Sequence, residues 1–408
     1  MEETSVKTET TWRSRRLDAL GSAIFAEIAE WKAEALREGK DVIDLGIGSP
    51  DRPPAEVIRE ALGAEVLRAD RYGYPASRGS SAFRGKAAEW MDWRFGVKLC
   101  AEQEIVALMG SQDGLAHLAL AVTDPGDGAL VPDPGYPIYA AGLAVAGVEP
   151  IYIPLRAENG FLPDLDAISD EEWKRARFIL LNFPSNPVAS VAELPFLEKL
   201  VALAKRHRVL VVHDLAYSEM AYDSFRPPSI LQVPGALDIA VEFHSMSKSF
   251  NMAGCRIGFL AGNREAIAAL RDLKANLDYG VFEAVQQAAV AALEADMRQE
   301  LEPVGPVYEK RRDVFVRALA EAGWGVPSPR ATMFIWAPLP SIALSKGWSC
   351  RQISREMVKE AGVVVVPGEA FGEEGKGYVR IALVEDEDRL LEAAGRIGRF
   401  LRKLEDEQ

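Results

Sequence analysis

Residues 245–256 read SMSKSFNMAGCR, and this stretch says most about the chemistry of the chain. Lys248 follows a run of apolar residues that predicts a buried strand, and Arg256 comes eight positions later. Burial would disfavour the ammonium form of this lysine and expose an amine nucleophile. The surrounding hydroxyl groups and the arginine are groups that a phosphate binds. Taken alone, the stretch also fits a surface lysine in a serine-rich loop.

Seven short apolar runs around this stretch predict the strands of one sheet. The runs are mostly continuously apolar rather than alternating, which is typical of strands buried on both faces. Helical patterns lie between several of them, for example at Leu197, Leu200 and Val201. The alternation of strands and helices predicts an α/β domain with a mainly parallel sheet. The runs are Ile105–Met109, Ala129–Val131, Pro150–Ile153, Phe178–Leu181, Val209–Val212, Ile239–Phe243 and Ile257–Leu260.

Both ends of the chain predict a second, smaller domain. Residues 22–38 have a helical pattern, and Val307–Ala322 predicts an amphipathic helix. We expect a large domain over residues 50–295 and a smaller α+β domain built from residues 1–49 and 296–408. The strands predicted for the smaller domain are Phe334–Trp336, Val363–Val366 and Tyr378–Ile381.

Composition excludes several classes of protein. The chain has 408 residues, of which 48% are apolar and 26% charged, as in a globular protein with a large core. Its 47 basic and 61 acidic residues give a net charge of −14, which argues against nucleic acid or an anionic membrane as partner. Four histidines without ligand spacing and three scattered cysteines predict neither a metal site nor disulfides. We find no targeting or membrane-spanning segment, and we expect a cytoplasmic location.

Two further segments carry candidate groups at the ends of predicted strands. The strand at 209–213 runs into Asp214, and the carboxyl ends of strands in α/β sheets are where ligands bind. Gly110, Ser111 and Gln112 follow another strand and open a helix, so their N–H groups and the helix dipole predict an anion site. Either segment alone is also explained by helix capping.

Together these segments resemble the class I and II aminotransferases, the pyridoxal 5'-phosphate (PLP) enzymes of fold type I. The resemblance is nearest to the branch of the LL-diaminopimelate aminotransferases and covers about residues 20–400. It implies a mainly parallel central sheet flanked by helices, with a smaller domain formed from both termini. The matching segments are DLGIGSPD at 44–51, Tyr74 with Gly79, GSQ at 110–112, DPGYP at 133–137, NFPSNP at 182–187, Asp214 with Tyr217, the stretch at 245–256, and Arg380.

The resemblance implies a role for each matching residue toward PLP. Lys248 would hold the cofactor as a Schiff base and then act as general base and acid. Asp214 would pair with the pyridine nitrogen and keep it protonated. Tyr217 and Asn186 would bind the phenolic oxygen of the ring, and Tyr136 would stack on its face. The residues expected at the phosphate are Ser111, Gln112, Ser245, Ser247 and Arg256.

Other matching residues concern the substrate and the partner subunit. Arg380 would clamp the substrate α-carboxylate with two hydrogen bonds, beside Asn186, and Gly48 would let the substrate approach the backbone. Tyr74 would reach the cofactor phosphate of a neighbouring subunit, which implies a homodimer with shared active sites. The resemblance therefore implies transamination between an L-amino acid and a 2-oxo acid by a ping-pong mechanism.

The sequence leaves the amino donor open. Ala23 and Tyr279 depart from residues that contribute to the site of diaminopimelate enzymes, so LL-diaminopimelate and neutral, aromatic or acidic amino acids remain candidates. A carbon–sulfur lyase or another PLP lyase would reuse the same cofactor residues. A non-catalytic PLP-fold regulator is a remote alternative. Apolar residues that could line a side-chain pocket are Ile24, Phe25, Met333, Phe334 and Trp336.

Overall fold

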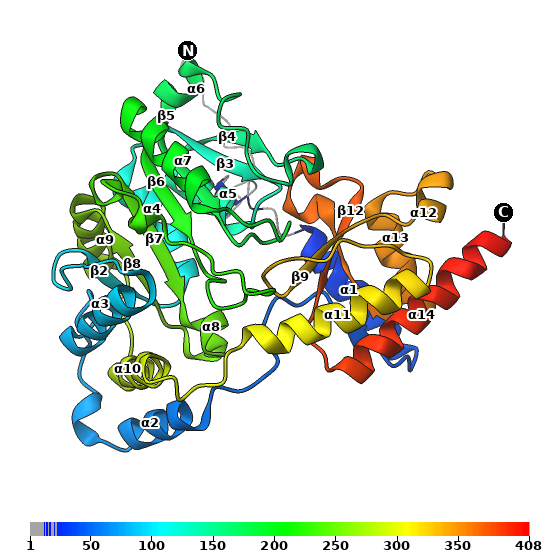
Figure 1. The fold of residues 1–408 in the computed structure, drawn as a ribbon, viewed down its shortest axis with the longest axis horizontal. Coiled ribbons are helices and arrows are strands. Elements are labelled where there is room, and N and C mark those ends of the chain that lie inside the picture. Colours follow the sequence, from blue (N-terminus) through cyan, green and yellow to red (C-terminus); the bar gives the residue numbers. More distant parts are fainter. Residues whose placement is uncertain (1–11, 13, 15, 18–19, 21–22, 408) are drawn as a thin grey trace, which may run out of the picture.

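The computed structural model describes residues 12, 14, 16–17, 20 and 23–407. The first sixteen residues, in which we found no targeting signal, lie mostly outside the described residues. Two layered parts are visible side by side (Figure 1): one contains the cyan and green middle of the chain, and the other combines the blue N-terminal helix with the orange and red C-terminal segments. In the described part of the chain, no helix is long and apolar enough to cross a membrane.

A seven-stranded sheet forms the centre of the larger part. Its strand order is β2-β8-β7-β6-β5-β3-β4, and only β8 runs antiparallel to its neighbours. All seven predicted strands and the mainly parallel arrangement are confirmed. The bounds are β2 (Ile105–Leu108), β3 (Gly128–Asp133), β4 (Glu149–Pro154), β5 (Ala176–Asn182), β6 (Leu210–Asp214), β7 (Ala240–Ser245) and β8 (Gly258–Gly262).

Helices cover both faces of this sheet. On one face, α4, α5 and α9 contribute Leu118, Leu143 and Leu270 to a buried apolar cluster. On the other face, α3 and α7 contribute Trp90 and Leu200 to a second cluster, which α10 also joins. Burial on both faces explains why the strands are continuously apolar. The helices are α2 (Glu56–Val66), α3 (Ser81–Phe95), α4 (Ser111–Val122), α5 (Ile138–Ala146), α6 (Asp170–Arg175), α7 (Leu194–His207), α8 (Met246–Ser249), α9 (Arg264–Leu277) and α10 (Glu283–Met297).

The smaller part has two short sheets packed with helices. β9, β11 and β12 form an antiparallel sheet, and β1 pairs with β10 in parallel. Ile43 and Leu45 share a buried core with residues from beyond position 304, so the two ends of the chain pack together. The division at residues 50 and 295 stays a prediction. The elements are α1 (Ala23–Arg37), β1 (Ile43–Asp44), α11 (Gly305–Glu321), β9 (Phe334–Pro338), α12 (Ser341–Ser345), α13 (Cys350–Glu356), β10 (Val363–Val364), β11 (Val366–Pro367), β12 (Tyr378–Ala382) and α14 (Glu387–Asp406).

One predicted strand is divided in the structure. The run Val363–Val366 was expected to form a single strand, and it instead forms two that pair with different partners. Val364 pairs with Asp44 of β1, whereas Val366 pairs with Arg380 of β12. The run is apolar throughout because both halves are buried, so its composition does not reveal where the chain changes partner.

Candidate active site

A cavity of about 810 Å³ opens where β5, β6 and β7 end. The last residues of β5 and β6, Asn182 and Asp214, are register partners and both line it, as does Ser245 at the end of β7. The carboxyl ends of parallel strands are where α/β sheets bind ligands. The cavity brings together all the predicted site residues except Tyr74. These are Gly48, Ser111, Gln112, Tyr136, Asn186, Asp214, Tyr217, Ser245, Ser247, Lys248, Arg256 and Arg380.

Lys248 projects into this cavity from α8, a single turn of helix that follows β7 directly. Its Nζ donates a hydrogen bond to the carbonyl oxygen of Gly48. Burial, with the nearby charges of Arg380 and Arg256, lowers the pKa of Lys248 to about 8. A substantial fraction of this amine is therefore neutral near physiological pH, as a nucleophilic lysine requires.

Asp214 is a buried carboxyl with one oxygen in use. Oδ2 accepts a hydrogen bond of 2.8 Å from the hydroxyl of Tyr139, and the backbone oxygen accepts one of 2.7 Å from Asn182. Oδ1 is buried and has no hydrogen-bond partner among the described residues. Burial raises the pKa of Asp214, and the bond from Tyr139 opposes this rise. The free oxygen fits a cationic N–H donor such as a protonated pyridine nitrogen.

The residues expected at a phosphate form an anion cradle. Ser111 and Gln112 begin α4, where backbone N–H groups and the helix dipole favour an anion. Gly110 precedes them with a φ of +76°, and any side chain there would collide with the guanidinium of Arg256. Arg256 Nη1 lies 3.4 Å from the hydroxyl of Ser247. Cation, hydroxyl and helix N-terminus together fit the phosphate of PLP.

Two tyrosines line the cavity that also contains the carboxyl and the lysine. Tyr136 donates a hydrogen bond of 3.0 Å to Oε1 of Gln112, which ties it to the anion cradle. Tyr217 packs edge-on against Phe334 and lies below Lys248, whose Nζ is 5.9 Å from the ring centre. Burial raises the pKa of both phenols, so both remain protonated hydrogen-bond donors at neutral pH.

Arg380 reaches the cavity from β12, in the other part of the molecule. It donates hydrogen bonds of 2.9 Å to Oδ1 of Asn186 and 2.7 Å to the backbone oxygen of Gly46. Its guanidinium lies against the rings of Phe334 and Phe371. Burial lowers its pKa to about 10, which leaves it charged at neutral pH. Its Nε is buried without a partner among the described residues, so the group retains capacity for an anion.

Tyr74 lies away from the cavity. Its side chain is 92% exposed, and its ring packs against Tyr279, with 5.5 Å between the ring centres. Among the apolar candidates, Phe25 lines the cavity and Phe334 contacts Arg380, whereas Met333 and Trp336 are buried in the core. Ile24 lines a neighbouring pocket, and Ala23 is the first residue of α1.

The structure gives contacts to four residues that received no role of their own from the sequence, although Asp44 and Asn182 begin two of the matching segments. Tyr139 and Asn182 hold Asp214, and Lys32 and Asp44 line the cavity as an ion pair with 2.7 Å between Nζ and Oδ2. Helical spacing in the sequence could have indicated Tyr139 and Lys32. Tyr139 lies about one helical turn after Tyr136, and Lys32 lies one turn after Ile28 in the predicted N-terminal helix.

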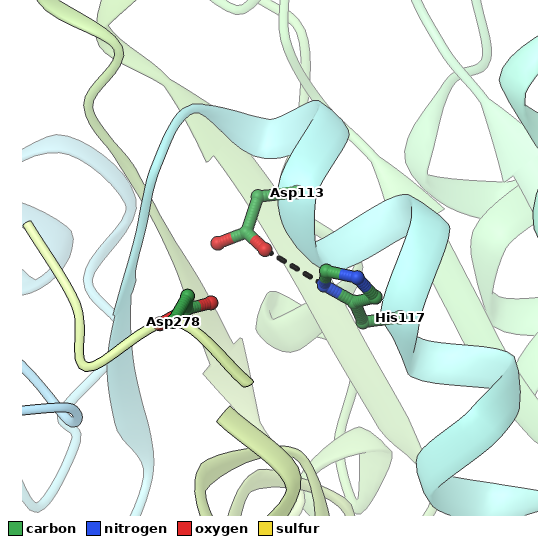
Figure 2. Close-up of side chains that lie close together, drawn as sticks. All are labelled: Asp113, His117 and Asp278. Carbon is green, nitrogen blue, oxygen red and sulfur yellow. Dashed lines mark hydrogen bonds and ion pairs between the residues drawn. The ribbon is translucent and has the colours of Figure 1, made fainter. Parts of the chain in front are cut away.

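Asp113, His117 and Asp278 form a cluster at the start of α4 and the end of α9 (Figure 2). The ligand atoms of these three residues could surround a metal cation, but the ammonium group of Lys274 already provides a positive charge at this place. Its Nζ lies 2.5 Å from Asp113 Oδ2 and 2.7 Å from Asp278 Oδ2. Burial raises the pKa of Asp113, yet His117 and Lys274 outweigh this and lower it to about 2. The cluster therefore joins the start of α4 to the end of α9.

Comparisons with known proteins agree with this geometry. The family model for aminotransferase class I and II matches residues 40–397. LL-diaminopimelate aminotransferase 2 from Trichormus variabilis is 44% identical over 94% of this chain and 97% of its own length. A substrate-bound structure of BacF from Bacillus subtilis is 33% identical, with a TM-score of 0.90, 96% of this chain covered and 98% of that one. A probable N-succinyldiaminopimelate aminotransferase from Thermus thermophilus is 38% identical, with a TM-score of 0.85, 92% of this chain covered and all of that one.

The likeness extends over both the sequence and the fold. The family match covers well over half of the chain, and the structural neighbours share the mainly parallel sheet flanked by helices. This chain is therefore an aminotransferase that belongs to the class I and II family of PLP enzymes with fold type I, in the branch of the LL-diaminopimelate aminotransferases.

Proposed function

We propose that this enzyme transfers the amino group of an L-amino acid to a 2-oxo acid in two half-reactions within the cavity at the ends of β5, β6 and β7. The observation that carries the proposal is that Lys248, with its lowered pKa, and the buried cation of Arg380 face the same cavity. An amine nucleophile and a carboxylate clamp are the two groups that amino-acid chemistry on PLP requires. The chemistry supplied by bound PLP is an electron sink for the α-carbon and a carrier for the amino group.

Different residues of the cavity would bind different parts of the cofactor. Lys248 would form the covalent carbon–nitrogen link to the cofactor aldehyde, and its freed amine would move a proton at the substrate α-carbon. Asp214 would accept the pyridine N–H through its free Oδ1. Tyr217 and Asn186 would donate to the phenolic oxygen, and Tyr136 would stack on the ring. The phosphate would bind Ser111, Gln112, Ser245, Ser247 and Arg256.

Arg380 would bind the α-carboxylate of the amino acid. Two partners already hold its guanidinium, Asn186 and Gly46, so the group is fixed before the substrate arrives. A fixed cation loses little freedom on binding, which favours affinity. Gly48 lies beside it, since a side chain there would come within 3.8 Å of Arg380 Nη1. The small residue leaves room for the substrate.

For the amino donor we propose LL-diaminopimelate first, because relatives of that name are 44% identical over nearly the whole chain. Neutral, aromatic and acidic amino acids are the further candidates. We also propose a homodimer in which Tyr74 reaches the partner's cofactor phosphate. Its exposure and its packing against Tyr279, itself 60% exposed, support a partner at this surface.

A half-reaction screen tests the proposed function. Each amino acid is mixed with the PLP form, and its conversion to the pyridoxamine form is followed by absorbance. We expect conversion by LL-diaminopimelate, and borohydride should fix the cofactor on Lys248, as peptide mapping would reveal. Release of ammonia and pyruvate instead of pyridoxamine phosphate would indicate a lyase, and absence of a lysine adduct would reject the proposal.

A further inference from the structure

A short backbone segment contacts both the arginine and the lysine on which the proposed function depends. The carbonyl oxygen of Gly46 accepts a hydrogen bond of 2.7 Å from Arg380, and that of Gly48 accepts one from Lys248. Residues 46–50 follow β1 and lead to α2, so they connect the smaller part of the molecule to the larger (Figure 1). We call residues 46–50 the connecting segment.

The connecting segment contains two glycines, and its position depends on what holds its ends. A side chain would not fit at either glycine, because its Cβ would lie 3.2 Å from Asp44 Oδ1 at Gly46 and 3.1 Å from Phe334 Cζ at Gly48. Glycine also restricts the backbone least of all residues. Just before the segment, Leu45 is fixed by backbone hydrogen bonds of 3.0 Å to β10 and 2.7 Å to β12.

Arg311 of α11 holds the other end. Its side chain is buried, and Nη1 and Nη2 donate hydrogen bonds of 2.7 Å to the two carboxylate oxygens of Asp51, the residue after the segment. Nη1 also donates one of 3.0 Å to the carbonyl oxygen of Leu383, three residues after Arg380. Burial would lower the pKa of Arg311, but Asp51 outweighs this and raises it. One guanidinium therefore fixes both the segment that contacts Arg380 and the chain that carries it.

A purely structural role for this ion pair would be to hold α11 in place. Apolar contacts already do so, because Tyr308, Phe315 and Leu319 of this helix are buried in a cluster with residues of β9 and β12. A buried ion pair is weak evidence for stability, since removing two charges from water offsets much of their attraction. Fold stability alone therefore does not explain the pair.

The next residue of the helix makes a similar pair elsewhere. Arg312 is also buried, and it donates hydrogen bonds of 2.6 and 3.0 Å to the carboxylate of Asp223 and one of 2.9 Å to the carbonyl oxygen of Pro329. This second pair joins α11 to the chain that follows β6, not to the connecting segment. The two pairs have the same chemistry on the same helix, so one is a matched control for the other.

We propose that Arg311 and Asp51 are positioning residues for the reaction, because their ion pair fixes the connecting segment that places Arg380 for the substrate α-carboxylate. The inference rests on the proposed function, in which Arg380 is the carboxylate clamp. A clamp with two hydrogen bonds tolerates little displacement, and a shift of about 1 Å costs up to about 100-fold in rate. Neither positioning residue touches the substrate.

The test compares Asp51→Asn with Asp223→Asn in the full-length holoenzyme. Each variant removes one charge from its ion pair and keeps the size of the side chain. In Asp51→Asn we expect KM for LL-diaminopimelate to rise by about three- to tenfold, with a smaller change in kcat. Asp223→Asn should leave KM at the wild-type value, although the midpoint of chemical denaturation should fall in both variants. An unchanged KM in Asp51→Asn, or an equal rise in both, would overturn the inference.

Binding of a simple carboxylate tests the positioning without turnover. Hexanoate has a carboxylate and no amino group, and calorimetry gives its Kd for the holoenzyme. This Kd should rise in Asp51→Asn by about the same factor as KM, whereas the Kd for PLP should change far less. Equal losses of affinity for hexanoate and PLP would indicate general damage to the site and would contradict the role. Arg311→Lys keeps the charge without the planar guanidinium, so its effect should lie between those of the wild type and Arg311→Leu.

Arg380→Ala separates a failure of this inference from a failure of the proposed function. If Arg380→Ala raises KM and Asp51→Asn does not, only the positioning role is rejected. If Arg380→Ala itself leaves KM unchanged, the clamp is rejected together with the residues inferred to position it. In the double variant, Asp51→Asn should raise KM no further than Arg380→Ala does alone, because both changes act through the same guanidinium.

Discussion

The hydroxyl of Tyr139 donates a hydrogen bond of 2.8 Å to Oδ2 of Asp214, across 75 residues of sequence. Burial raises the pKa of Asp214, and this bond opposes the rise because it favours the ionised carboxylate. The carboxylate must be ionised to pair with a protonated pyridine nitrogen. If Asp214 pairs with the pyridine nitrogen as proposed, Tyr139 would act as a positioning residue that favours the charged form of this carboxyl.

Replacing Tyr139 by Phe should make the enzyme more sensitive to acid. Without the bond, the pKa of Asp214 rises further, so protonation disables it at higher pH. We expect the acid limb of the kcat/KM profile to move up by about one pH unit or less, since one such bond contributes about 1 kcal/mol. Tyr378→Phe, whose ring stacks on Trp336 instead, serves as control. An unmoved acid limb in Tyr139→Phe would contradict this role.

Lys248 should capture the cofactor with an unusual pH dependence. Its pKa is lowered to about 8, and the neutral amine is the reacting form. The rate at which cofactor-free protein binds PLP covalently should rise with pH, with a midpoint near 8 rather than near 10.5. Arg380→Ala should move that midpoint upward, because its charge lowers the pKa of the lysine. A midpoint near that of an ordinary lysine would show that burial does not act as inferred.

Arg380→Ala should separate substrate affinity from cofactor affinity. Loss of a charge-assisted clamp on the α-carboxylate should raise KM for the amino acid by about 10- to 100-fold. The Kd for PLP, measured by absorbance titration, should change far less, because the anion cradle is formed by other residues. Arg380→Lys retains the charge but loses the planar guanidinium that makes two hydrogen bonds. Its KM for the amino acid should therefore lie between those of the wild type and Arg380→Ala. If KM for the amino acid and Kd for PLP rise by the same factor, the proposal that Arg380 clamps the α-carboxylate is rejected.

Much of the fold could be predicted from the sequence, because strands buried on both faces leave continuous apolar runs. The cavity residues in short motifs, such as Lys248 with Arg256, were also predictable, since they lie close together in the chain. Contacts between distant segments were not. Helical spacing indicates the helix face of Tyr139 and of Lys32, but it does not reveal that their partners are Asp214 and Asp44, because the partners come from different elements. The change of partner strand at Val365 was hidden for a similar reason, as both halves of that run are buried.

Lys274→Met should weaken phosphate binding as well as stability. The lysine is fully buried, and removing it leaves Asp113 and Asp278 without their cation at the start of α4. We expect the free energy of unfolding to fall by about 3 kcal/mol or more, measured by chemical denaturation. Affinity should fall more for PLP than for pyridoxal, which lacks the phosphate. The free energy of unfolding of the double variant Lys274→Met/Asp278→Asn should fall by less than the sum of the decreases in the two single variants. Equal losses of affinity for PLP and pyridoxal would show that the cluster has no link to the cradle.

Mixing two variants, each of which should be inactive by itself if the proposed dimer is right, tests whether Tyr74 serves the partner's site. Lys248→Ala removes the amine from its own cavity, and in the proposed dimer Tyr74→Ala would remove a phosphate contact from the partner's cavity. In a mixed dimer one site then loses both groups and the other is intact. When the two chains are refolded together in equal amounts, half of the dimers are mixed, so about one quarter of the wild-type activity should return. If Tyr74 instead served its own cavity, each site of the mixed dimer would lack one group, and no activity would return. Lys310→Met in place of Tyr74→Ala provides the control for a fully competent partner.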